Sequence, residues 1–176
     1  MKFLSILSLS LAFTLPQPSL FSHLGSISQA KATTVQSYNN ASLYEIWFPS
    51  DWVLEETIPE YLILRNRELS QWRHSGELPE TVIQTNIYLT EVSFEDSIRY
   101  QGREGSTKVS QSKVEIDGMS AQRSYFTGLS SDFSDVIITT IRYSPTETVM
   151  MASFYNASNS SAKDEIISLH NSFQKP

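Results

Sequence analysis

The chain has 176 residues, no cysteine, 18% charged residues and a formal net charge of −6. The absence of cysteine excludes thiol catalysis, disulfides, cysteine-bound zinc and acylation of the bacterial lipoprotein kind. The acidic balance, with basic residues scattered singly, excludes nucleic acid as an expected partner and disfavours an anionic bilayer surface.

Residues 1–32 have the pattern of a signal peptide. Lys2 supplies the positive start, an apolar run covers residues 3–15, and the segment contains no acidic residue. Ala30 and Ala32 are small enough for cleavage after residue 32, and loss of the segment's two lysines would take the net charge to −8. The apolar run is too short for a ~30 Å hydrocarbon core, so we expect cleavage and export, with an uncleaved anchor as the alternative.

A polar lead and a first strand follow. Residues 33–41 lack periodicity, which predicts a flexible lead ahead of one domain over residues 42–176. The run 43–48 alternates between apolar and other residues, which predicts a strand with Trp47 facing away from its apolar neighbours. Pro49 has no N–H to give to a strand ladder and would end this strand.

The aromatic residues around this first turn are expected to hold the domain together. Tyr44 and Phe48 share the inward face of the strand, and the turn Pro49-Ser50-Asp51 would bring Trp52 back over the end of the sheet. Burial explains these three rings better than a ligand platform does. Trp47 is the exception, since it would lie either beneath a helix or exposed for a partner.

Six further runs rich in Val, Ile, Thr and Tyr predict strands. They lie at residues 61–67, 82–90, 108–116, 120–129, 136–143 and 148–155. Asp117-Gly118 between two of these runs is a strong signal for a hairpin turn. Because most connections are short, we expect the strands to pair antiparallel.

Two helices are predicted. Ser93, three residues before Asp96, resembles a capping box at the start of a short helix that Gly102 ends. Ser160 or Ser161 would cap a final helix, whose apolar residues recur at the helical period, at Ile166, Leu169 and Phe173. A stripe of this kind must pack on a sheet. The predicted fold class is therefore α+β, an antiparallel β-sheet flanked by helices.

No set of catalytic residues is apparent, and we expect no enzymatic activity. The chain has no G-x-S-x-G or S-x-x-K frame and no phosphate-binding glycine loop. His170 borders the apolar stripe of the final helix, which predicts a partly buried, hydrogen-bonded histidine. The candidate partner-binding residues are Trp47, with Trp72 and His74 in the polar excursion at residues 69–80.

Acidic residues cluster in three places, none of which has the spacing of an EF-hand loop. The clusters are Glu55 with Glu56, Glu91 with Glu95 and Asp96, and Asp132 with Asp135. A solvated acidic surface explains them. We expect no cofactor, while a loose divalent-cation site at one cluster, or a zinc site that includes His74, stays open and the metal ligands stay unknown.

Several stretches carry a resemblance to a known family when they are taken in chain order. They are Phe48-Pro49-Ser50-Asp51-Trp52, the hairpin from Val114 to Arg123, Phe154-Tyr155-Asn156-Ala157, and Ser172-Phe173. Together they resemble the PsbP-like family, which includes the extrinsic proteins of the oxygen-evolving complex and DcrB-like bacterial envelope proteins. The resemblance covers about residues 42–174.

The resemblance implies an α/β/α sandwich and an exported chain in a periplasm or thylakoid lumen. Family members are generally non-enzymatic, and they bind membrane complexes, such as photosystem II, or assist their assembly. This chain departs from the family in having no cysteine to acylate. No metal-binding histidines of the family map onto it either.

The expected function is that of an exported, non-catalytic auxiliary protein that assists the assembly or stability of a membrane complex. Its partner would be a protein, reached without direct insertion into the bilayer after signal cleavage. The alternative is a periplasmic domain that binds a small molecule or a metal ion through Trp72, His74 and nearby carboxylates.

Overall fold

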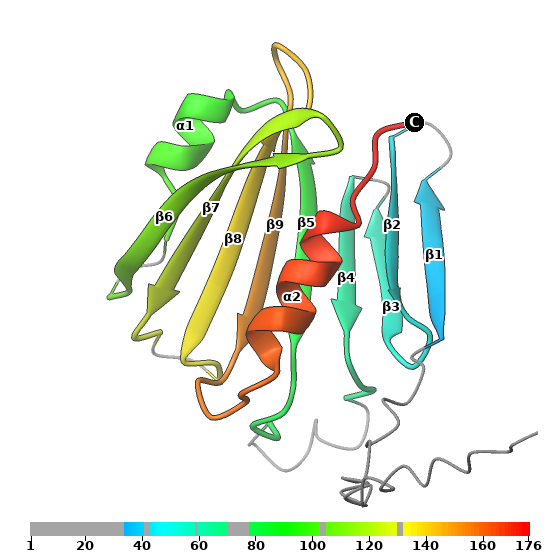
Figure 1. The fold of residues 1–176 in the computed structure, drawn as a ribbon, viewed down its shortest axis with the longest axis vertical. Coiled ribbons are helices and arrows are strands. Elements are labelled where there is room, and N and C mark those ends of the chain that lie inside the picture. Colours follow the sequence, from blue (N-terminus) through cyan, green and yellow to red (C-terminus); the bar gives the residue numbers. More distant parts are fainter. Residues whose placement is uncertain (1–33, 41–42, 59, 70–77, 103–104, 130–131) are drawn as a thin grey trace, which may run out of the picture. The chain divides into compact units, whose positions relative to one another are not determined.

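The structure, a computed structural model, describes residues 34–40, 43–58, 60–69, 78–102, 105–129 and 132–176. These residues form nine strands and two helices, arranged as one large sheet, one small ribbon and helices on both faces of the large sheet (Figure 1). The expected α+β class, with an antiparallel sheet flanked by helices, is confirmed.

Seven strands form the large sheet, in the order β3-β4-β5-β9-β8-β7-β6 (Figure 1). Their bounds are β3 Val53–Ile58, β4 Tyr61–Arg65, β5 Gln84–Thr90, β6 Thr107–Ile116, β7 Met119–Thr127, β8 Asp135–Arg142 and β9 Thr148–Tyr155. Every pairing is antiparallel, as expected for β3-β4 and for β6 to β9, whose connections are short. The last strand, β9, inserts between β5 and β8 and so joins the two halves of the sheet.

β1 (Val35–Asn40) and β2 (Tyr44–Pro49) form a separate antiparallel ribbon. The segment predicted as a flexible lead, residues 33–41, therefore contains a strand whose Asn40 lies opposite Tyr44. β1 is mostly exposed and pairs only with β2. A strand at an edge needs no apolar alternation, because backbone hydrogen bonds to its neighbour hold it in place.

The alternation predicted for the first strand is confirmed in β2. Tyr44 and Phe48 are buried, with 0% and 3% of their surface exposed, whereas Trp47 is 42% exposed. The backbone N–H of Trp52 donates to the carbonyl of Pro49 at 3.0 Å, which closes the predicted turn. Trp52 is then only 6% exposed, so these inward rings serve cohesion.

The sequence pattern does not predict β3. Its sequence VLEETI has no clear alternation, and Leu54 and Ile58 remain exposed because β3 is an edge strand paired only with β4. The predicted strand 61–67 also ends earlier, at Arg65. Asn66 leaves the ladder and uses its amide oxygen to accept a hydrogen bond from the backbone N–H of Ile83 at 2.9 Å.

The predicted hairpin and first helix are both present. Asp117 and Gly118 adopt positive φ values of 48° and 72°, as a tight turn between twisted strands requires. Helix α1 (Phe94–Arg99) begins after Ser93, whose hydroxyl accepts from the backbone N–H of Asp96 at 3.2 Å. The capping geometry read from the sequence is therefore formed.

Helix α2 (Ala162–Asn171) packs Ile166 and Leu169 of the predicted stripe on the sheet. Phe173 is buried as well, but it lies beyond the end of the helix. Ser161 occupies the N-cap position, but its side chain makes no capping hydrogen bond. Its backbone is already helical, with φ −86° and ψ −17°, and its hydroxyl donates to the side-chain oxygen of Asn159 instead.

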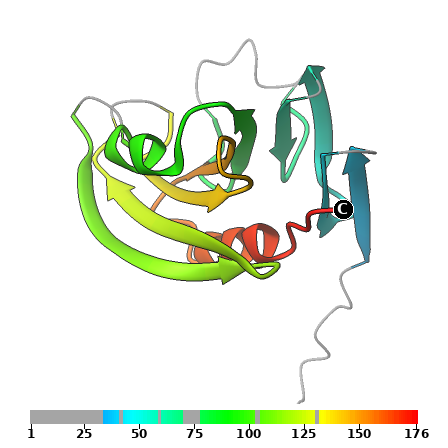
Figure 2. The same ribbon diagram turned by 90° about the horizontal axis from the view of Figure 1, so that it is seen from above.

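The two helices cover opposite faces of the sheet (Figure 2). Thr139 and Thr140 are neighbours on β8 and therefore point to opposite faces. Thr139 contacts His170 of α2, whereas Thr140 accepts from Gln101 just beyond α1. The larger core lies on the α2 face and includes the inward residues of β2, and a smaller core around Phe126 and Phe154 lies on the α1 face.

Candidate functional site

Trp47 is held at the junction of β2 and α2. Its backbone N–H donates to the hydroxyl of Ser172 at 3.0 Å, and that hydroxyl lies 2.7 Å from the carbonyl oxygen of Trp47. Next to this pair, Glu45 and Gln174 form an antiparallel bridge with N–H to carbonyl distances of 2.9 and 2.8 Å. The backbone that carries the exposed indole is thus tied to the C-terminal segment on one edge, and it pairs with β1 on the other.

A groove of about 400 Å³ lies between the ribbon and α2. Its lining residues are Val35, Trp47, Phe48, Pro49, Asp164, Glu165, Ser168, Leu169 and Ser172. We call this feature the Trp47 groove. One wall of the groove is apolar and comes from the ribbon. The volume of the groove falls within the ~300–1,000 Å³ typical of binding pockets.

The α2 wall of the Trp47 groove is polar and acidic at one end. Asp164, Ser168 and Ser172 follow one another at four-residue intervals and therefore share one face of the helix. Asp164 and Glu165 lie in the first turn of α2. Neither carboxylate takes part in any of the salt bridges found among the residues that the structure describes.

The other two predicted partner-binding residues, Trp72 and His74, lie outside the described residues. Their role in partner binding stays a prediction. For Trp47 the sequence left two alternatives, burial under a helix or exposure to a partner. The structure combines them, since the indole stands beside α2 with nearly half of its surface in solvent.

A buried polar network lies between α2 and the sheet. The sequence predicted a partly buried, hydrogen-bonded His170; the ring is hydrogen-bonded but fully buried, and sequence reasoning missed its partners. The Nδ1 atom of His170 lies 2.8 Å from the hydroxyl of Thr139, and its Nε2 atom lies 2.8 Å from the hydroxyl of Ser153. The hydroxyls of Ser153 and Thr85 are 2.6 Å apart. Arg123 enters from β7 and donates from Nε to Thr139 at 2.9 Å.

Burial controls the protonation of this network. Burial, together with the positive charge of Arg123, lowers the pKa of His170 to about 3. Desolvation also lowers the pKa of the Arg123 guanidinium. Ser153 and His170 are both 0% exposed, so this serine and histidine pair has no surface on which a substrate could lie.

The fold was compared with solved structures. The solution structure of cyanobacterial PsbP from Synechocystis sp. PCC 6803 superposes with a TM-score of 0.56 at 13% identity, over 87% of this chain and 99% of that one. The chain has the PsbP-like fold. LpqN of Mycobacterium tuberculosis, described as involved in cell envelope biogenesis, superposes with a TM-score of 0.55 at 10% identity, over 84% of this chain and 88% of that one.

These similarities lie in the fold alone. Neither a protein-family model nor a curated protein sequence matches it. The expected resemblance to the PsbP-like family is confirmed at the level of the fold. Among the described residues, no helix is long and apolar enough to cross a membrane.

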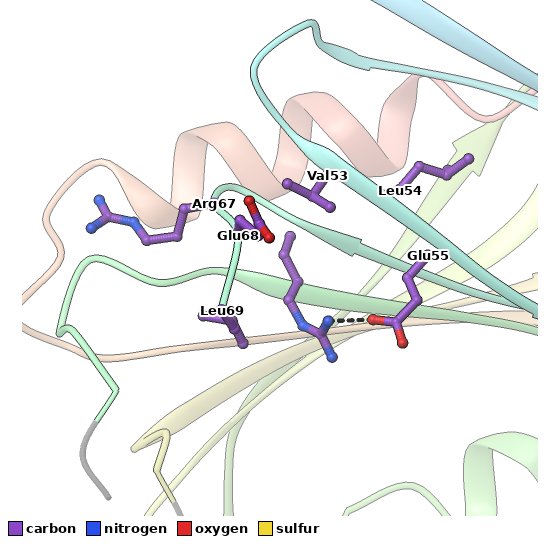
Figure 3. A pocket seen from close by; sticks show the side chains of 7 residues that line it. Val53, Leu54, Glu55, Arg67, Glu68 and Leu69 are labelled. Carbon is purple, nitrogen blue, oxygen red and sulfur yellow. Dashed lines mark hydrogen bonds and ion pairs between the residues drawn. The ribbon is translucent and has the colours of Figure 1, made fainter. Parts of the chain in front are cut away.

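A second hollow of this PsbP-like fold, of about 220 Å³, lies at the β3 edge (Figure 3). Its lining residues are Val53, Leu54, Glu55, Arg65, Arg67, Glu68 and Leu69. Figure 3 shows the ion pair between Arg65 and Glu55, while Arg67 points away from it. Two arginines and two glutamates line this hollow, so its formal charges balance.

The acidic clusters noted in the sequence make no metal centre in the described part of this PsbP-like chain, where no group of three or more His, Asp and Glu side chains could hold an ion. Glu95 instead pairs with Arg142 across α1 and β8, which lowers the pKa of its carboxyl group. Arg142 also stacks over the ring of Phe94 at 4.6 Å.

Proposed function

We propose that this chain is an exported, non-catalytic auxiliary protein that binds a component of a membrane complex through the Trp47 groove. The observation that carries the proposal is the contrast along β2. Ile46 and Phe48 are buried, yet Trp47 between them keeps 42% of its surface exposed beside a groove of about 400 Å³. Tryptophan on a rigid frame is a frequent anchor of protein interfaces.

Rigidity supports binding rather than chemistry at this groove. The ribbon and α2 are tied together by the Ser172 contacts and the bridge between Glu45 and Gln174, so the groove walls need little ordering when a partner arrives. The serine and histidine pair that might serve a hydrolase is enclosed in the core. Its hydrogen bonds hold α2 to β8 and β9 and so support one wall of the groove.

The export part of the proposal rests on the signal-peptide pattern of residues 1–32. The PsbP-like fold supports the auxiliary role, since it is shared with cyanobacterial PsbP and with LpqN, which is described as involved in cell envelope biogenesis. The assembly role and the periplasm or thylakoid lumen as its compartment are our proposal for this chain. Photosystem II is one membrane complex that such a protein could serve.

Site-specific photo-crosslinking tests the proposal in cells that express the full chain. Ser168 in the groove wall is replaced by p-benzoylphenylalanine, and exposed Ser112 on β6 carries the same group as the control. We expect Ser168 to give a discrete adduct with a subunit of a membrane complex, and Trp47→Ala to abolish that adduct. An adduct that persists in Trp47→Ala, or that forms equally from Ser112, overturns the proposal.

A further inference from the structure

The chemistry of the two groove walls identifies the kind of partner segment, an inference that rests on the proposed function. The ribbon wall offers Trp47, Pro49 and Val35, while the α2 wall ends in Asp164 and Glu165. We infer that the Trp47 groove binds a polypeptide segment in which a large apolar side chain is followed closely by a lysine or arginine.

The volume of the groove sets the size of the apolar anchor. A space of about 400 Å³ accepts one aromatic side chain, or two aliphatic ones, together with the backbone that carries them. The ring of Phe48 and the side chain of Leu169 are buried at 3% exposure each and form the floor. An apolar group placed on this floor loses its contact with water, which is the main source of affinity at such a site.

The carboxylates of Asp164 and Glu165 account for the basic residue of the partner segment. Asp164 is exposed and Glu165 half-buried, and neither takes part in a salt bridge among the described residues. Both stabilise the first turn of α2 through the helix dipole, but that interaction leaves their oxygens open to a cation at the groove. A basic side chain of the partner would be complementary, and an acidic one would be repelled.

The helix also sets the distance between the two contacts. Leu169 follows Glu165 by one helical turn, a rise of roughly 6 Å at ~1.5 Å per residue. A residue pair two positions apart spans a similar distance in an extended segment. The expected motif is therefore an aromatic or large aliphatic residue with a lysine or arginine about two positions away.

Peptide display on the purified full chain tests the inference, using random 12-residue peptides and counter-selection on Trp47→Ala. We expect the selected peptides to share this apolar and basic pair. The double variant Asp164→Asn/Glu165→Gln should lower the affinity for these peptides about fivefold, which is the size of an exposed charge-pair interaction. Glu115→Gln on β6, the control, should leave the affinity unchanged. Ser168→Lys, which places a cation within the groove, should weaken them as well. Thermal midpoints verify that each variant folds.

The outcomes separate this inference from the proposed function. Selected peptides without a basic residue, or an affinity that the Asp164→Asn/Glu165→Gln variant leaves unchanged while Trp47→Ala lowers it, would overturn the inference and leave the groove as a docking site. A selection in which counter-selection on Trp47→Ala removes every peptide that binds the native chain would overturn both. A roughly fivefold loss of affinity in 0.5 M salt supports the charge contact, and an unchanged affinity contradicts it.

Discussion

The Nδ1 atom of His170 lies 2.8 Å from the hydroxyl of Thr139, and this contact joins α2 to the middle of the sheet in a layer closed to solvent. Arg123 donates to the same hydroxyl. If Thr139 in turn donates to Nδ1, then Nε2 of His170 carries the proton and donates to Ser153. This arrangement satisfies both ring nitrogens of a neutral histidine.

Removal of His170 should destabilise the fold. His170→Ala leaves the hydroxyls of Thr139 and Ser153 without their common partner and opens a cavity, so the free energy of unfolding should fall by about 2–4 kcal/mol. Urea denaturation at pH 7 measures the change. Asn171→Ala serves as the neighbouring control, since it removes only the acceptor of one Arg123 hydrogen bond. A loss below about 0.5 kcal/mol for His170→Ala would mean that the network does not hold α2.

Stability should also depend on pH through His170. Its folded pKa of about 3 lies below the value of about 6.5 expected in the unfolded chain, so only the unfolded chain takes up a proton between these values. The stability that the neutral ring contributes is complete above about pH 6.5 and is lost as the pH falls towards 3. The slope of this contribution should approach ~1.4 kcal/mol per pH unit between these two pKa values.

The measurement compares native chain and His170→Gln by urea denaturation between pH 7 and 4. Glutamine keeps hydrogen-bonding groups but does not titrate, so carboxylate effects common to both chains cancel in the difference. The native chain should lose stability more steeply. Parallel curves would show that His170 keeps its ordinary pKa in the folded chain.

Arg123 should adjust this acid response. Arg123→Met removes the positive charge that helps to lower the pKa of His170, so that pKa should rise. In the Arg123→Met background, the difference in free energy of unfolding between the chain with His170 and its His170→Gln variant should therefore stop changing at a higher pH as the solution is acidified. Arg123→Lys keeps the charge and should retain the native profile. The readout is the pH on the acid side below which the stability difference no longer changes. The same value in Arg123→Met and in the native background would exclude this electrostatic coupling.

Neighbouring aromatic residues of β2 should respond in opposite ways. Phe48→Ala empties a buried position and should lower the free energy of unfolding by ~3–5 kcal/mol. Trp47→Ala removes a half-exposed ring and should cost about 1 kcal/mol or less. Denaturation midpoints of the two variants test this contrast, and equal losses would mean that Trp47 is a core residue.

Much of the fold could be predicted because its inward residues repeat at the periods of strands and helices. The alternation of β2 and the Ile166 stripe of α2 follow from these periods, whereas β9 follows from its β-branched and aromatic content and the hairpin from its Asp117-Gly118 turn. β1 and β3 were not predictable in this way. Both are edge strands that bury little, so their backbone partners and not their side chains determine their conformation.

The candidate site was only partly predictable for a different reason. The outward position of Trp47 follows from alternation, but the groove beside it depends on α2, which begins more than a hundred residues later. The network around His170 likewise joins residues of four strands and one helix. One signal was available, because Arg123 occupies an inward position of β7 between Ala121 and Tyr125.

Affinity for the membrane-complex subunit that crosslinks from Ser168 tests the central claim most directly. With that subunit purified, the dissociation constant of the full chain is compared with those of Trp47→Ala and Tyr100→Ala, an aromatic control that is 74% exposed on the α1 side. Trp47→Ala should weaken binding by about 30-fold, as loss of an interface anchor does, and Tyr100→Ala should have no effect. Equal dissociation constants for the native chain and Trp47→Ala would contradict the account.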